Sequence, residues 1–128
     1  MTPSPLSKET GGGLTFKELI EQLKRIPCEE IRKESDGYYE FVISTQSLAQ
    51  LYPIFEVYFG VPFKPAGISP SDEAKDVSKN YGGIQKQQTL YYIHREGMSN
   101  CAMIWPWGDG SRATVKIAQG IIEKNGAK

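Results

Sequence analysis

Two glycine-containing turns, each between segments with the composition of β-strands, limit what this chain can fold into. The pairs Asp36-Gly37 and Glu96-Gly97 are such turns, because glycine adopts the positive φ of a tight hairpin without a clash at Cβ. Residues 38–43, 89–95 and 99–105 are strand-like, whereas residues 31–34 are short, charged and weak as a strand. Since a tight turn joins neighbouring antiparallel strands, the sequence predicts two antiparallel hairpins.

Helical periodicity precedes and follows the first hairpin. Residues 16–26 carry apolar side chains at helical spacing, and Thr15 with Glu18 forms a capping box in front of them. A second helix is predicted at about residues 46–59. It contains Pro53, which removes a helical hydrogen bond, so a break there or a strand after it is the alternative.

A third amphipathic helix is predicted after the second hairpin, from Ser111 as N-cap to about Lys124. Its core-facing residues would be Val115, Ala118, Ile121 and Ile122. The predicted fold is therefore α+β, with element order α-β-β-α-loop-β-β-α. We expect a four-stranded antiparallel sheet with about three helices packed on one face.

Two segments differ in composition from the rest. Residues 1–13 are rich in Pro, Ser, Thr and Gly and are predicted to be a mobile tail, followed by a single domain over 14–125. Residues 61–88 contain few periodic apolar positions and are predicted to be a long loop, with a short helix over 71–79 as an option inside it. Loops of this length usually carry function or are disordered.

Charge and cysteine content narrow the function classes. The formal net charge is zero, which argues against nucleic acid or an anionic membrane as partner. No apolar run approaches a membrane span, and the first residues lack the apolar core of a secretory signal, so we expect a cytoplasmic protein. Cys28 and Cys101 are then expected to be free thiols, although a disulfide between them stays open.

The turn between Trp105 and Arg112 is the first candidate site. If a helix begins at Ser111, its free N–H groups and Arg112 favour an anion, and Trp107 offers a ring for stacking. Asp109 would repel that anion. The alternative is an ordinary turn with both tryptophans in packing contacts.

A second candidate is the pair His94 and Cys101. Pairing about the turn at 95–98 places His94 opposite Ser99, which makes Cys101 its diagonal neighbour. A cysteine beside a histidine is a nucleophile-and-base arrangement, but only Glu96 offers an orienting carboxylate. No ligand cluster has the spacing of a metal site and no motif indicates a cofactor, so we expect neither.

Aromatic side chains interleaved with cations form the third candidate. The aromatic residues are Tyr81, Tyr91, Tyr92, Trp105 and Trp107, and the cations are Lys79, Lys86, Arg95 and Arg112. Such residues on an exposed sheet face bind partners or stack on bases, whereas on a covered face they only pack.

The leading hypothesis from the sequence is a non-enzymatic binding domain for a protein partner or small ligand. Its site would combine an aromatic sheet face, the 61–88 loop and the turn at 105–112. The candidate ligand-binding residues are Lys64, Tyr81, Tyr92, His94, Trp105, Trp107, Ser111 and Arg112. The alternatives are an enzyme or binding protein for a phosphate or carboxylate at 110–112, and weak single-stranded nucleic-acid binding. The sequence leaves a homodimer open.

Overall fold

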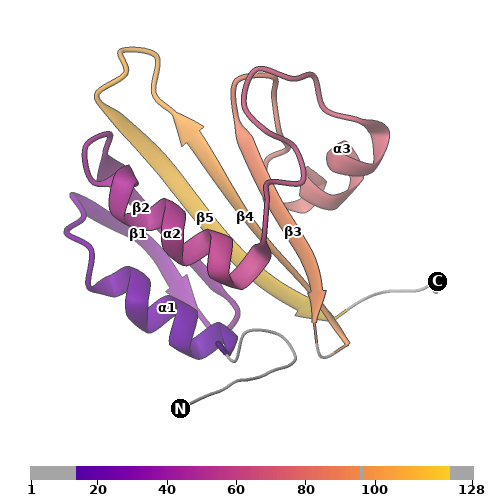
Figure 1. Ribbon diagram of the computed structural model, residues 1–128, viewed down its shortest axis with the longest axis horizontal. Helices are drawn as coiled ribbons and strands as arrows, with labels where there is room; N and C mark the ends of the chain where they lie inside the picture. The colour runs from indigo at the N-terminus through magenta and orange to yellow at the C-terminus, as the bar shows by residue number, and fades with distance from the viewer. Residues whose placement is uncertain (1–13, 96, 122–128) are drawn as a thin grey trace.

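The computed structural model describes residues 14–95 and 97–121, which form a five-stranded antiparallel sheet with three α-helices (Figure 1). The elements are α1 (Phe16–Lys24), β1 (Glu30–Ser35), β2 (Tyr38–Ser44), α2 (Leu48–Phe59), α3 (Asp72–Ser78), the 3-10 turn η1 (Lys79–Tyr81), β3 (Thr89–Arg95), β4 (Met98–Pro106) and β5 (Arg112–Ile121). The strand order is β1-β2-β5-β4-β3. The predicted α+β class is confirmed, but the predicted number of four strands is wrong.

Several predictions concern residues outside this description. The predicted tail at 1–13, the end of the predicted last helix at 122–124, and Glu96 of the second turn lie outside the described residues.

The last element is the main correction, because residues 112–121 form the central strand β5 and not a helix. Ala113, Val115 and Ile117 belong to the core on one face of the sheet, whereas Lys116 lines a groove on the other. This alternation has the two-residue period of a strand. β5 pairs with β2 on one side and β4 on the other, so neighbouring strands satisfy the backbone groups that a helix would bond internally.

The predicted capping box and both hairpins are confirmed. Thr15 Oγ1 accepts the Glu18 N–H at 3.1 Å, and Glu18 Oε1 accepts the Thr15 N–H at 3.0 Å. Gly37 and Gly97 have φ values of 79° and 74°, as their turns require. β1 pairs with β2, and β3 pairs with β4.

The second predicted helix is confirmed, because α2 continues through Pro53 and the alternative of a break there does not occur. Pro53 itself is exposed, whereas Leu51, Phe55 and Tyr58 are buried on the opposite side of the helix. A proline in a helix interior costs about 3 kcal/mol, and each fully buried large apolar side chain contributes about 2 kcal/mol. Burial of this face therefore outweighs the missing hydrogen bond.

The helices do not all pack on one face, contrary to the prediction (Figure 1). Helices α1 and α2 cover the first face, where Leu23 and Phe55 meet Phe41 and Val115 in the larger core cluster. Helix α3 packs on the second face at the β3 edge, where the smaller core cluster consists of Ala74, Ile84, Leu90, Cys101, Met103 and Ala118. We call the remainder of the second face, over β1, β2 and β5, the open face.

Candidate binding site on the open face of the sheet

A groove lies between the open face and the turn that follows α3. It has a volume of about 400 Å³ and is lined by Lys33, Ser35, Tyr38, Glu40, Asn80, Tyr81, Gly82 and Lys116. The lining combines two ammonium groups, one carboxylate and two phenol rings. We call this site the lysine groove.

Strand register places the charged residues of the groove in one row. Lys33 of β1 pairs with Glu40 of β2, and Glu40 pairs with Lys116 of β5. A β-bulge between Ile31 and Lys33 brings Lys33 into this register. The row carries two positive charges and one negative charge.

Lys116 is a half-buried ammonium with few internal partners. Its Nζ donates to the carbonyl oxygen of Tyr81 at 2.9 Å and lies 3.5 Å from the ring centroid of Trp105. Burial lowers the pKa of Lys116, and the charge of Glu40 partly opposes this shift. Within residues 14–95 and 97–121, no carboxylate lies within 4.0 Å of this ammonium.

Two tyrosine rings form one side of the groove. Tyr38 and Tyr81 are nearly parallel, with ring centroids 6.1 Å apart and an interplanar angle of 16°. The Tyr38 hydroxyl donates to Glu40 Oε1 at 2.7 Å, and the Lys33 Nζ lies 5.9 Å from the Tyr38 ring centroid. Burial, and then the bond to Glu40, raise the pKa of Tyr38 well above its ordinary value.

Gly82 allows the turn to approach the sheet closely. Its φ is 103°, and a Cβ at this position would lie 2.5 Å from Trp105 Cη2. Only glycine fits both the backbone conformation and the space. Trp105 is thus held between Gly82 and Lys116, and its Nε1 is buried with no hydrogen-bond partner in the described part of the chain.

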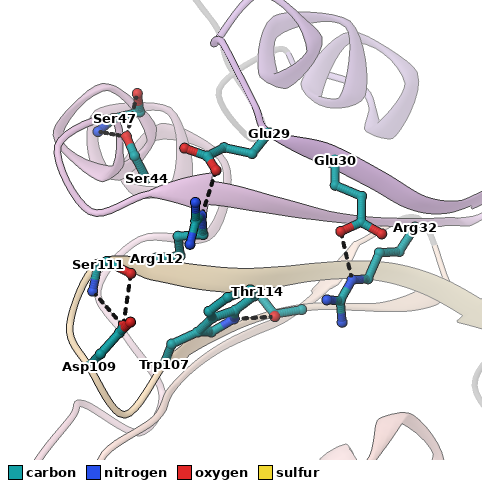
Figure 2. A network of polar contacts seen from close by, with 10 residues as sticks. All are labelled: Glu29, Glu30, Arg32, Ser44, Ser47, Trp107, Asp109, Ser111, Arg112 and Thr114. Carbon is teal, nitrogen blue, oxygen red and sulfur yellow. Dashed lines mark hydrogen bonds and ion pairs between the residues drawn. The ribbon is translucent and has the colours of Figure 1, made fainter.

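The other end of the open face has a different polar network, which Figure 2 shows. We call it the arginine cluster; it consists of Glu29, Glu30, Arg32, Trp107, Arg112 and Thr114. Arg112 Nε lies 2.5 Å from Glu29 Oε1, and Arg32 Nε lies 3.6 Å from Glu30 Oε1. The Trp107 indole donates to Thr114 Oγ1 at 3.0 Å, with both guanidinium groups near its ring. Each cation here has a carboxylate partner.

The prediction of an anion site at residues 110–112 depended on a helix that the structure does not contain. Ser111 precedes a strand, so the helix N-terminus that would attract the anion does not form. The Ser111 N–H and hydroxyl both donate to Asp109 Oδ1, at 2.9 and 2.8 Å. These bonds hold the pKa of Asp109 below its usual value. The carboxylate of Asp109 therefore takes the position that an external anion would need.

The predicted pairing of His94 with Ser99 is confirmed, and Cys101 pairs with Tyr92. The Tyr92 hydroxyl contacts His94 Nε2, and His94 itself is exposed. Cys101 is buried, and burial raises the pKa of its thiol to about 12. A thiol with this pKa stays protonated at neutral pH, so Cys101 is not an activated nucleophile. Cys28 and Cys101 are both free thiols.

Lys64 is only 3% exposed, although the sequence suggests a ligand-binding side chain. Its Nζ donates to the carbonyl oxygens of Gln85, Lys86 and Gln88, at 2.8, 2.6 and 2.6 Å. Burial lowers the pKa of Lys64. The Lys64 backbone also forms an antiparallel bridge with Leu90 of β3. Lys64 therefore holds the 61–88 segment against β3.

The structure brings some of the predicted site residues together and separates others. Tyr81 lines the lysine groove and Trp105 packs against it, while Trp107 and Arg112 lie in the arginine cluster beside Ser111. Tyr92 and His94 lie on β3, outside both sites.

The sequence prediction missed most of the groove. The missed residues are Lys33, Ser35, Tyr38, Glu40 and Lys116, whereas Asn80 and Gly82 belong to the 61–88 loop that the predicted site included. The available signal is the alternation of a strand over residues 38–43, which puts Tyr38 and Glu40 on the same face. Lys116 was hidden because its segment was predicted to be a helix.

Among the described residues, no group of three or more His, Cys, Asp or Glu side chains is arranged to hold a metal ion. No helix in the described ranges has the length and apolar character needed to cross a membrane. Comparisons with family models, curated proteins and solved structures found no match to this chain.

Proposed function

We propose that this protein is a non-enzymatic binding domain whose site is the lysine groove. The observation that carries the proposal is the environment of Lys116, a half-buried ammonium that meets one carbonyl oxygen and an indole ring. An ammonium removed from water is stabilised by a bound partner that supplies hydrogen-bond acceptors.

The surroundings of Lys116 are those of a recognition surface. The paired rings of Tyr38 and Tyr81 offer flat apolar area beside the charged row. Aromatic and cationic side chains of this kind are enriched where proteins bind partners. The Gly82 turn fixes one wall of the groove, so the site is formed before a ligand arrives.

The same surroundings favour binding over catalysis. The chain's one histidine, His94, does not line the groove, and the Cys101 thiol is buried with a raised pKa. The groove thus brings together cations, phenols and one carboxylate without an activated nucleophile beside a base.

The test is an amide-shift titration of ¹⁵N-labelled protein with a set of defined probes. The probes are three capped pentapeptides with a central tyrosine flanked by glutamates, glutamines or lysines, together with citrate, AMP and a thymidine oligonucleotide. We expect at least one probe to shift the amides of Lys33, Tyr38, Gly82 and Lys116.

Two variants define the site. Lys116→Met removes the ammonium at the centre of the groove and is expected to weaken binding of that probe. Lys17→Met is the matched control, because Lys17 is an exposed lysine of α1, which covers the first face of the sheet. The proposal fails if no probe shifts the groove amides, or if the shifts gather around His94 or Lys17 instead.

A further inference from the structure

Resting on the proposed function, we infer that the lysine groove binds an acidic segment of a protein partner, with one carboxylate held between Lys33 and Lys116. The inference concerns the chemistry of the ligand and not the location of the site.

The charge of the groove is the first argument. In the described part of the chain Lys24, Arg32, Lys79 and Arg112 each have a carboxylate within 4.0 Å. Lys33 and Lys116 have none; their contacts are with the rings of Tyr38 and Trp105 and with one carbonyl oxygen. Other described lysines, such as Lys17 and Lys75, also have no carboxylate within 4.0 Å in this part of the chain, but Lys33 and Lys116 line the same groove.

Geometry places these two cations around a common position. Lys33 and Lys116 lie in one row with Glu40 between them, so their backbones are two strand spacings apart, about 10 Å. Both side chains line the groove. A lysine side chain is long and flexible, so the two ammonium groups can reach one carboxylate above the row.

Glu40 sets how much negative charge the ligand can carry. Its carboxylate accepts the Tyr38 hydroxyl at 2.7 Å, and it lowers the net charge of the row to +1. One carboxylate neutralises that charge. A phosphate monoester would place a charge of about −1.5 to −2 on a single group beside Glu40, whereas the carboxylates of an acidic segment are spread along its chain. Asn80 and Ser35 add neutral polar groups at the margin.

The form of the groove favours a polypeptide segment over a free small molecule. Charged and polar side chains make up most of the lining, whereas pockets for small ligands are mostly apolar and bury about 70–90% of the ligand. An extended segment gains additional contact along the face, with the Tyr38 and Tyr81 rings as flat surface beside its carboxylate.

The experiment compares matched peptides by isothermal titration calorimetry at about 50 mM salt, where exposed charges are little screened. We expect the glutamate pentapeptide to bind about tenfold tighter than its glutamine counterpart, and this preference to shrink at about 500 mM salt. Lys33→Met and Lys116→Met should each remove most of the preference, Lys116→Arg should retain it, and Lys17→Met should leave it unchanged.

The outcomes separate this inference from the proposed function. If the glutamine or lysine peptide, AMP or the oligonucleotide binds the groove as well as the glutamate peptide, the inference is overturned while the binding site stands. Citrate binding as tightly as the glutamate peptide overturns the polypeptide partner in favour of a small carboxylate. If no probe shifts the groove amides, both fail. Should Lys116→Met not fold, Lys33→Met and Lys116→Arg decide the question.

Discussion

The arginine cluster and the lysine groove lie on the same open face, and both bring cations from β1 and β5 next to aromatic rings. In the cluster, Arg112 and Arg32 lie 2.5 and 3.6 Å from carboxylates. In the groove, Lys33 and Lys116 contact rings and a carbonyl oxygen. The difference is that the cluster pairs its cations with carboxylates within the fold, whereas the two groove lysines have no carboxylate within 4.0 Å among the described residues. The proposed acidic partner would supply that carboxylate.

Residue type agrees with these two roles. A guanidinium is planar and matches a carboxylate edge while stacking on an aromatic ring, as Arg112 does between Glu29 and Trp107. An ammonium is a compact charge on a flexible chain, which adapts to an arriving ligand. The comparison predicts that substitutions in the two regions, and at Lys64 as a fully satisfied lysine, have different consequences.

The largest expected effect is the loss of stability in Lys64→Met. This change leaves the carbonyl oxygens of Gln85, Lys86 and Gln88 without their donor, and a buried unsatisfied group costs about 1–3 kcal/mol. We expect a loss of about 3 kcal/mol in the free energy of unfolding, measured by urea denaturation. Lys116→Met, which leaves only the carbonyl oxygen of Tyr81 without its donor, should cost about 1 kcal/mol. If the two variants lose the same free energy of unfolding, Lys64 and Lys116 do not differ in the way that the comparison requires.

The next effect concerns the wall of the groove and uses two neighbouring glycines. Gly82→Ala forces a Cβ to 2.5 Å from Trp105, whereas Gly83→Ala meets open space at a similarly positive φ. Both changes carry about 1–2 kcal/mol of backbone strain, and overpacking adds about 1–3 kcal/mol at Gly82 alone.

We therefore expect Gly82→Ala to be less stable than Gly83→Ala by about 2 kcal/mol in urea denaturation. Gly82→Ala should also lose binding of the glutamate peptide, because the turn must move away from Lys116. If the two variants have the same stability and affinity, the close approach of the turn does not shape the groove.

The third effect is a pH dependence of binding. Burial lowers the pKa of Lys116 from its ordinary value of 10.5, so its ammonium loses its proton before an exposed lysine does. Deprotonation removes the positive charge that attracts a carboxylate, so affinity for the glutamate peptide should fall as pH rises, with a midpoint below 10.5. We expect a decrease of about five- to tenfold. Lys116→Arg should abolish the decrease in this range, and an unchanged pH profile in that variant would exclude Lys116 as the titrating group.

Features of the fold that depend on neighbouring residues were predictable from the sequence. The capping box at Thr15 and Glu18 and the turns at Gly37 and Gly97 need only a few adjacent side chains, and all three form. The central strand β5 was not predictable in this way. Its residues Val115 and Ala118 also fit a helical spacing, and pairing with β2 and β4, distant in sequence, decides in favour of a strand.

The same reason explains why the site was only partly predicted. Tyr81 and Trp105 were identified from their residue type alone. The row of Lys33, Glu40 and Lys116 exists only once β5 is inserted beside β2, so no local pattern indicates it. The sequence likewise does not indicate which backbone carbonyls a buried lysine such as Lys64 will bind.

The smallest expected effect, and the most direct test of the comparison, is Glu29→Gln in the arginine cluster. Glu29 and Arg112 side chains are 43% and 42% exposed, and exposed ion pairs contribute less than about 1 kcal/mol, so stability should change little. The substitution does, however, remove the carboxylate partner of Arg112 while keeping the shape of the side chain. The cluster then contains an unpaired cation beside Trp107, as the groove contains one beside Trp105.

We expect the glutamate peptide to shift the amides of Arg112 and Trp107 in this variant but not in the wild type. If those amides stay unchanged, an unpaired cation beside a ring is insufficient to bind an acidic segment, and the groove's wall at Gly82 becomes the deciding feature.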